Sequence, residues 1–371
     1  MRAVIDRDKF LSALGHVQSV VERRNTIPIL SNVLIQAADG KIRLTATDLD
    51  LEVVEDTAAT IEEAGALTAP AHLLHDIVRK LPEGAQLSLD EGEPGRVSVV
   101  SGRARFHLST LPAEDFPELA AKEASNTFSI SADELKFLID RTRFAISTEE
   151  TRYYLNGIYF HTTEKDGKML LRAVATDGHR LACAEVRAPD GAAGMPGIIV
   201  PRKTVNELMR LFDAADEDIE VALSENTIRF DIDGVVLTSK LIDGRFPDYE
   251  RVIPVDNDKR LEVDTRLFAQ AVDRVSTVSS EKGRAVKFSI SAEALLLSVN
   301  NPEAGSAEEE LAASFNAEPM EIGFNARYLL DIVGQFGGDT AVFLLSDTGS
   351  PTIMRDNAED NVLYVLMPMR V

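Results

Sequence analysis

Few of the side chains that could carry out chemistry stand close together in this sequence. His179 lies in the polar segment ATDGHRLA, two residues after Asp177, and a histidine that acts as a general base needs such an orienting partner. An Asp-Gly-His segment also suits a tight turn, because an aspartate side chain accepts hydrogen bonds from the backbone that follows it. We interpret the segment as a turn. We expect Cys183, on the strand that follows, to be a buried and inert thiol.

Other chemical patterns are weak or missing. The acidic run 308–310 could bind a hard cation, but it lacks the alternating ligands and turn glycine of a calcium loop, so we interpret it as a solvated acidic face. Three glycines between residues 191 and 197 favour a flexible hairpin over a nucleotide site. The sequence contains no phosphate-binding loop, no HExxH motif and no GxSxG motif. We therefore expect no catalytic residue, no metal and no cofactor.

The charge of the chain argues at first against nucleic acid. Its 371 residues include 39 Lys and Arg against 61 Asp and Glu, a formal net charge of −22 at pH 7, and phosphate binding needs cations. The segments with helical periodicity nevertheless carry a small positive excess, whereas the rest of the chain is strongly acidic. This distribution fits a basic surface lined by helices, and it fits ordinary solvated helix faces equally well.

The sequence shows no sign of secretion or membrane insertion. Its single cysteine excludes an intrachain disulfide framework and a Cys-rich zinc module. No stretch of about 18 consecutive apolar residues is present, and the N-terminal segment MRAVIDRDKFLSALG mixes charges into its apolar positions. We expect a cytoplasmic protein with no membrane association.

Three features recur along the chain in the same order. They are a strand pattern that ends at Asp48, Asp177 and Asn301, a helical segment that begins at Pro70, Pro201 and Asn325, and a Phe-Pro pair at 116–117 and 246–247. Successive copies of each feature lie about 125–130 residues apart. The ordered set predicts three copies of one domain.

Each copy is expected to hold two helices and many short strands. Helical spacing of apolar residues predicts first helices at 8–24, 133–147 and 264–276 and second helices at 70–80, 201–213 and 325–337. Pro70 and Pro201 fit the first turn of their helices. Alternating segments such as IRLTATD, GIYFHTT and LYVLMPM predict strands, and polar linkers lie near 120–127 and 254–259. The sequence thus predicts an α+β fold with domains at 1–122, 127–254 and 257–371.

Longer motifs resemble one known family. Similar segments in the bacterial DNA sliding clamp, the beta subunit of DNA polymerase III, match TRYYLNGIYF (151–160), VATDGHRLA (174–182), VPRKTVNELMRL (200–211), SKLIDGRFPDYERVIP (239–254) and VLMPMRV (365–371). The resemblance runs from end to end and agrees with the threefold repeat. It implies three repeated DNA-clamp domains, each with two helices inside and antiparallel sheets outside, in a ring-shaped homodimer.

The resemblance also implies a function without catalysis. The ring would encircle double-stranded DNA regardless of sequence and act as the processivity factor of the replicative polymerase. It would tether the DNA polymerase III alpha subunit, the clamp loader delta subunit, and other polymerases and repair proteins that carry clamp-binding peptides. Weak phosphate contacts would suit sliding. Two alternatives stay open: an acidic-residue-dependent hydrolase, which needs a paired carboxylate site, and a structural β-rich protein that binds no DNA.

Positions that match the family imply three sets of site residues. A hydrophobic peptide-binding groove would comprise Arg152, Tyr154, Leu155, Thr176, Gly178, His179, Leu181, Pro247, Arg251, Val252, Asn325, Tyr328, Val365, Leu366, Met367, Pro368, Met369 and Arg370. Duplex DNA would contact Arg24, Tyr153, Tyr154, Arg202 and Lys203. At the dimer interface Arg96, Arg103 and Arg105 would face Glu303, Glu308 and Glu309 of the other copy, and Phe106 and Leu108 would pack against Val275 and Val278.

The resemblance assigns finer roles to some of these side chains. Within the groove, a pocket for a large apolar residue of the peptide would be formed by Leu155, Leu181, Val252 and Met367. Met369 would act as a movable gate beside that pocket, because methionine adapts its shape to different partners. Among the DNA contacts, Arg24 and Lys203 are expected to be exposed.

Overall fold

The computed structural model describes residues 1–371 except 94, 120–122, 213–217, 280–283 and 371. The linker predicted near 120–127 and the end of the helix predicted at 201–213 therefore lie partly outside the described residues. The described chain forms two compact units. Unit 1 contains residues 1–133, 189–192 and 203–241, and unit 2 contains residues 134–188, 193–202 and 242–371. The central repeat is divided between them.

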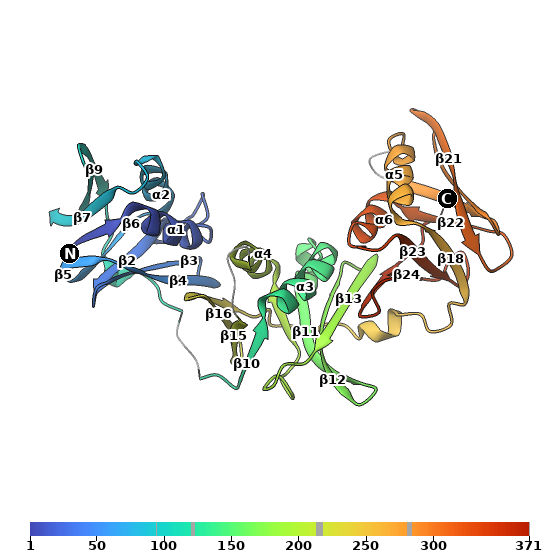
Figure 1. Ribbon diagram of the computed structural model, residues 1–371, viewed down its shortest axis with the longest axis horizontal. Coiled ribbons are helices and arrows are strands. Elements are labelled where there is room, and N and C mark those ends of the chain that lie inside the picture. The colour runs from blue at the N-terminus through green and yellow to red at the C-terminus, as the bar shows by residue number, and fades with distance from the viewer. Residues whose placement is uncertain (94, 120–122, 213–217, 280–283, 371) are drawn as a thin grey trace. The chain divides into compact units, whose positions relative to one another are not determined.

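The first repeat sets the pattern for the other two. A strand runs directly into a helix, several strands follow, and a second strand–helix pair comes before the last strands. Its elements are β1 (Arg2–Asp6), α1 (Arg7–Gln18), β2 (Asn32–Ala38), β3 (Lys41–Thr47), β4 (Leu51–Ala58), β5 (Thr60–Glu63), β6 (Gly65–Pro70), α2 (Ala71–Lys80), β7 (Gln86–Glu93), β8 (Arg96–Ser101) and β9 (Ala104–Ser109). In Figure 1, α1 and α2 lie side by side, as their contacts require.

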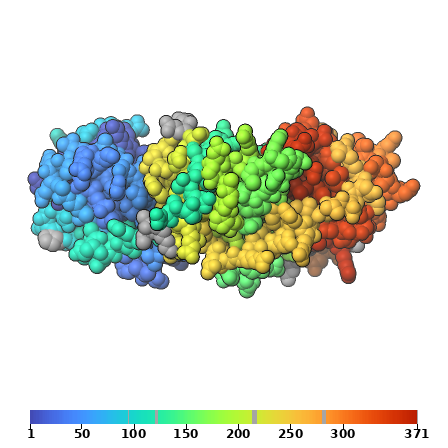
Figure 2. Space-filling view, turned by 90° about the horizontal axis from the view of Figure 1, so that it is seen from below, coloured from blue at the N-terminus to red at the C-terminus, as the bar shows by residue number. Residues whose placement is uncertain are grey.

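The second and third repeats keep this order. The second contains β10 (Asn126–Ser131), α3 (Ala132–Thr142), β11 (Gly157–Lys165), β12 (Lys168–Thr176), β13 (Arg180–Arg187), β14 (Ile198–Pro201), α4 (Arg202–Leu211), β15 (Asp218–Leu223), β16 (Thr227–Ile232) and β17 (Val235–Lys240). The third contains β18 (Lys259–Asp264), α5 (Thr265–Ser276), β19 (Ala285–Ile290), β20 (Ala294–Asn301), β21 (Gly305–Phe315), β22 (Met320–Asn325), α6 (Ala326–Val333), β23 (Thr340–Leu345), β24 (Thr352–Asp356) and β25 (Val362–Leu366). Residues 242–258, between the last two repeats, cross the surface of unit 2 (Figure 2).

Several helices end earlier than their periodicity predicts. We expected the first helix to reach residue 24, but α1 ends at Gln18, and Val20 and Val21 continue in a tight turn whose N–H groups bond three residues back. Both valines are buried, so the apolar spacing outlasts the helix. Likewise α3 gives way to a 3-10 turn at Arg143–Ala145, and α6 ends at Val333. Pro70 and Pro201 are the last residues of β6 and β14, just before the first turn.

The strands form antiparallel sheets that continue from one repeat into the next. In unit 1, one sheet has the order β5-β1-β7-β8-β9 and another the order β10-β15-β16-β17-β4-β3-β2-β6. In unit 2 the order is β14-β11-β12-β13-β25-β24-β23-β18-β21-β20-β19-β22. Two strand pairs therefore join neighbouring repeats: β17 with β4, which we call the first junction, and β13 with β25, which we call the second junction.

The two junctions have the same register. The paired residues at their ends are Val235 with Glu55 and Ser239 with Leu51 in the first, and Val362 with Ala184 and Leu366 with Arg180 in the second. Leu51 and Arg180 occupy equivalent positions, because each donates its N–H to the aspartate that precedes it by three residues, Asp48 or Asp177. Each junction thus pairs the fourth strand of one repeat with the last strand of another.

One fourth strand and one last strand have no partner from another repeat among the described strands. The last strand of the first repeat, β9, pairs with β8 alone. The fourth strand of the third repeat, β21, pairs with β20 over residues 305–312, and only residues 313–315 pair with β18 on its other side. An open strand edge presents unpaired N–H and C=O groups, which are available to another strand.

Candidate functional site

A small apolar cavity opens beside the second junction, inside unit 2. Its volume is about 170 Å³, and it is lined by Leu155, Thr176, Gly178, His179, Arg180, Leu181, Pro247, Asp248, Tyr249, Val252, Val365 and Met367. The lining comes from the 3-10 helices Glu150–Leu155 and Tyr249–Val252, from β12 and β13, and from the end of β25. Nine of the eighteen predicted groove residues are therefore brought together here.

The cavity has a buried floor and an exposed rim. Leu155, Leu181 and Val365 are between 2% and 5% exposed, and they belong to the core cluster that surrounds Cys183. Val252 and Met367 expose 49% and 39% of their surface. An apolar residue bound here would cover the rim side chains and rest on the floor. Leu181 is a core residue as well as a floor residue, so its truncation would also weaken the fold.

The turn between β12 and β13 shapes one wall. Asp177 Oδ1 accepts the N–H groups of His179 and Arg180 at 2.9 and 3.0 Å, and Thr176 Oγ1 donates to the carbonyl of Arg180 at 2.7 Å. Gly178 has φ +88, and an added Cβ would lie 2.7 Å from Arg152 Nη1. The interpretation of ATDGHRLA as a turn is confirmed. Cys183 is buried, as predicted, and burial raises the pKa of its thiol to about 12.

Three lining residues were missed by sequence reasoning: Arg180, Asp248 and Tyr249. The Arg180 guanidinium donates to Asp331 at 2.6 Å, to Asp177 at 3.1 Å and to the carbonyl of Phe144 at 2.7 Å. It also lies over the ring of Tyr328, 4.5 Å from the centroid. The signal was an arginine directly before the apolar strand segment LACA (181–184), because such a cation needs partners in the fold.

A second polar network holds Tyr249 in the wall. Its hydroxyl accepts a hydrogen bond from Arg172 Nη1 at 2.9 Å and lies 2.8 Å from His161 Nε2. The Tyr249 ring packs edge-on against Tyr159 and Phe246. Burial is the main reason that the pKa of Tyr249 lies above its ordinary value, so the hydroxyl stays neutral.

The other predicted groove residues lie outside the cavity lining. Leu366 is fully buried, because neighbouring strand residues face opposite sides and Val365 takes the cavity side; its assignment to the groove surface was wrong. Arg152 is half-buried and pairs with Glu149, and Arg251 is exposed and pairs with Asp248. The remaining positions are Tyr154, which packs against the floor cluster, Asn325, which caps α6, Tyr328, which stacks on His179, Met369, whose N–H donates to Gly323, and Pro368 and Arg370, which follow β25.

The predicted DNA contacts are mostly exposed. Arg24 lies in unit 1 and Arg202 in unit 2, both with exposed side chains; in unit 2 Tyr153 is 54% exposed and Tyr154 is half-buried. Lys203, in unit 1, is the exception. Its side chain is 35% exposed, and its ammonium is paired with Glu22 and Asp48. The expectation that Lys203 is exposed was wrong, because carboxylates of the first repeat cover it.

The residues predicted for the dimer interface fall on the two open edges and beside them. Arg96 on β8, Arg103 in the turn before β9 and Arg105 on β9 are exposed, and Glu303 and Glu308 are exposed at β21. Glu309 already pairs with Arg274 of its own chain at 2.5 Å. Val275 is 2% exposed, so it belongs to the core of the third repeat and cannot pack against another copy. Leu108, at 6% exposed, is also buried in this chain. Phe106 and Val278 are half-buried.

Within the described residues, no group of three His, Cys, Asp or Glu side chains is placed to hold a metal ion. Glu308, Glu309 and Glu310 lie along β21, where successive side chains point to opposite faces. None of the helices in the described part of the chain is long and apolar enough to cross a membrane.

Comparison with known proteins places the chain in one family. Models of the DNA polymerase III beta subunit match in the order N-terminal domain (residues 1–120), central domain (129–248) and C-terminal domain (250–370). The beta sliding clamp of Caulobacter vibrioides is 54% identical and that of Escherichia coli 42% identical, each over 100% of both chains. A solved sliding clamp from Bartonella birtlesii, bound to griselimycin, is 56% identical with a TM-score of 0.98 over 100% of both chains. The expected fold of three DNA-clamp domains is confirmed, and the chain belongs to the family of the bacterial DNA polymerase III beta subunit, the beta sliding clamp.

Proposed function

We propose that two copies of this chain close head to tail into a ring that encircles duplex DNA and serves as the processivity factor of DNA polymerase III. The ring carries out no chemistry; it holds its partners on DNA. The hydrolase and the structural-protein alternatives are not favoured, because the family match extends over the full length of the chain. We assign the ring to the cytoplasm, where bacterial DNA is replicated.

The single observation that best supports closure into a ring is the shared register of the two junctions. Each pairs a fourth strand with a last strand, and the strands left over are β21, a fourth strand, and β9, a last strand. A chain whose two ends expose complementary edges forms a heterologous contact with its copy. Six repeats joined in this way, at about 60° each, close the ring.

The same register predicts which residues face each other between copies. In the strand ladders Leu108 takes the place of Ser239, because Phe106 and Leu237 pair with equivalent residues of the preceding strands. Likewise Gly305 takes the place of Leu51, because Glu308 and Val54 pair with equivalent residues. Continuing the first junction's register places Arg105 opposite Glu308 and Arg103 opposite Glu310. Opposite charges on facing strand residues are favourable, each pair by roughly 0.2–1 kcal/mol. We therefore replace Glu309 by Glu310 in the predicted interface, since Glu309 is engaged with Arg274.

The cavity at the second junction is the proposed tethering site. A short extended peptide with one large apolar residue would place that residue on Leu155, Leu181 and Val365, between the rim residues Val252 and Met367. Peptides of this kind would come from the polymerase alpha subunit, the loader delta subunit, and other polymerases and repair proteins. An affinity of about 1 μM, or about −8 kcal/mol, would allow these partners to exchange.

Binding of DNA is proposed to be weak and independent of sequence. A ring needs few phosphate contacts, because its topology and not its affinity keeps it on DNA. Exposed Arg24 and Arg202, with Tyr153 and Tyr154, are the candidates for these contacts. The formal charge of −22 keeps the rest of the surface unattractive to phosphate.

The experiment introduces one cysteine on each open edge. Arg105→Cys combined with Glu308→Cys should form a disulfide between copies, because the two positions face each other; Arg105→Cys with Glu309→Cys, which points to the other face, is the matched control. Native Cys183 is buried and stays reduced. After loading, the covalent ring should stay on nicked circular DNA in high salt and leave once the DNA is cut.

Two results would contradict the proposal. Equal cross-linking of the test and control pairs would show that the register, and with it the argument for closure, is wrong. Covalent dimers that leave circular DNA as fast as linear DNA would show that the protein does not encircle the duplex.

A further inference from the structure

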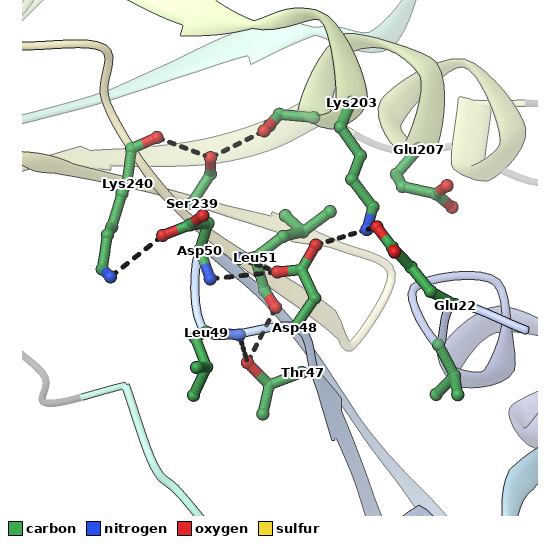
Figure 3. A network of polar contacts seen from close by, with 12 residues as sticks. Glu22, Thr47, Asp48, Leu49, Asp50, Leu51, Lys203, Glu207, Ser239 and Lys240 are labelled. Atoms are coloured by element: carbon green, nitrogen blue, oxygen red, sulfur yellow. Dashed lines mark hydrogen bonds and ion pairs between the residues drawn. The ribbon is translucent and has the colours of Figure 1, made fainter. Parts of the chain in front are cut away.

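Lys203 lies in a network of polar contacts within unit 1 (Figure 3). It is the second residue of α4, and its ammonium pairs with the carboxylates of Asp48 and Glu22, the latter at 3.0 Å. Asp48 follows β3 and Glu22 lies beyond the end of α1. One side chain of the second repeat thus connects two segments of the first.

Asp48 is fixed in place by the first junction. Its Oδ1 accepts the N–H groups of Asp50 at 3.0 Å and of Leu51 at 2.7 Å, and its Oδ2 accepts from Lys203. The side chain of Asp48 is only 13% exposed. These bonds shape the turn that starts β4, the strand that pairs with β17. The contact between Lys203 and Asp48 therefore lies at the start of the junction.

The charges around Lys203 leave little attraction for a phosphate. Two carboxylates surround one ammonium, so the group carries a net negative charge. A phosphate could reach Lys203 only by displacing one carboxylate, and it would then be repelled by the other. Burial lowers the pKa of Lys203, but the bonds to Asp48 and Glu22 raise it by more, and the ammonium stays charged.

The second junction contains a similar connection, but its cation and carboxylates lie on different elements. Asp177, the equivalent of Asp48, accepts Arg180 at 3.1 Å, and Arg180 reaches Asp331 on α6 at 2.6 Å. Here the cation belongs to the strand, whereas in the first junction it belongs to the helix. In both cases one cation connects the aspartate before the fourth strand to the second helix of the neighbouring repeat.

We propose that Lys203 is a structural tie of the first junction and not a DNA contact, and that Arg202 alone of these two neighbours contacts a phosphate. The inference rests on the proposed function only for its DNA part. Arg202 has an exposed side chain, and in the described part of the chain no ion pair holds it. The two adjacent cations of α4 thus have separate roles: Lys203 holds the first two repeats together, and Arg202 is free to meet DNA.

The test compares Lys203→Met with Arg202→Met in the full-length protein. Binding of a short duplex is measured by fluorescence anisotropy over a range of salt concentrations, and hydrogen exchange is measured in β4 and β17. Arg202→Met should reduce the slope of log K against log salt by about 0.9 and leave exchange unchanged. Lys203→Met should leave the slope unchanged and speed exchange of the junction amides by about three- to tenfold.

Asp48→Asn tests the tie from its other side. It should speed junction exchange, and the double variant should exchange no faster than Lys203→Met, because replacing Lys203 already removes its contact with Asp48. A slope reduced by about 0.9 in Lys203→Met, or junction exchange unchanged in that variant, would overturn the proposal. If the covalent ring were not retained on circular DNA, the proposed function would fail, and the exchange measurements would still decide the structural tie.

Discussion

Replacing Arg180 by methionine should lower the free energy of unfolding of unit 2 by about 2–4 kcal/mol. Arg180 is 8% exposed and donates to Asp331, Asp177 and the carbonyl of Phe144. Removing one member of a buried ion pair costs about 3–5 kcal/mol, because the other charge stays behind. The cost here is at the lower end. Asp331 is 32% exposed and can be hydrated, and Asp177 keeps two backbone N–H donors.

The assay is urea denaturation with hydrogen exchange of β13 and β25 to identify the transition of unit 2. The chain contains no tryptophan, so unfolding is followed by circular dichroism. Arg187→Met is the matched control, because Arg187 is exposed at the other end of β13. Arg180→Lys should lie between the parent and the methionine variant, since lysine keeps the charge but not the planar fork. A loss below about 1 kcal/mol, or one equal to that of Arg187→Met, would refute the energetic account.

Three further outcomes are expected. Met367→Ala should weaken binding of an apolar peptide by about 1–3 kcal/mol in a fluorescence titration while sedimentation still shows the dimer; unchanged affinity would remove the cavity from the tethering site. His16→Gln should destabilise the protein more at pH 5.5 than at pH 9. The bond to Glu55 raises the pKa of His16 above its usual 6.5, so its contribution is complete below 6.5 and is lost as pH rises through the folded pKa; equal losses at both pH values would contradict this. Cys183 should react with a thiol reagent at pH 8 only after unfolding, because its pKa is about 12, and rapid labelling of the folded protein would argue otherwise.

The repeated fold could be predicted because strand alternation is a local property. Segments such as 41–47 and 168–176 show this alternation, and they form β3 and β12. Helix ends were harder. Val20 and Val21 look like another helical turn, yet they are buried after the chain has left α1. Apolar spacing reports burial, and burial continues through a tight turn.

The candidate site was predicted less completely because exposure depends on neighbours that the sequence does not reveal. Val275 and Leu366 were assigned from the family resemblance, as Met367 was, but packing buries the first two. The sequence around Lys203 suggests an unpaired cation, but the fold places Asp48 and Glu22 beside it. Arg180 was overlooked for the opposite reason: its partners Asp331 and Phe144 are 151 and 36 residues away.

The charges on the two open strand edges also bear on which assemblies the chain avoids. If the β9 edge paired with the β9 edge of another copy, Arg105 and the neighbouring Arg103 would lie near cations, and β21 paired with itself would bring Glu308 and Glu310 near carboxylates. Both symmetric pairings are thus penalised by like charges, whereas pairing between unlike edges joins opposite charges. Bare strand edges ordinarily invite aggregation. Here the charges of each edge disfavour its own kind and favour the unlike edge, so they select the complementary pairing over the symmetric ones.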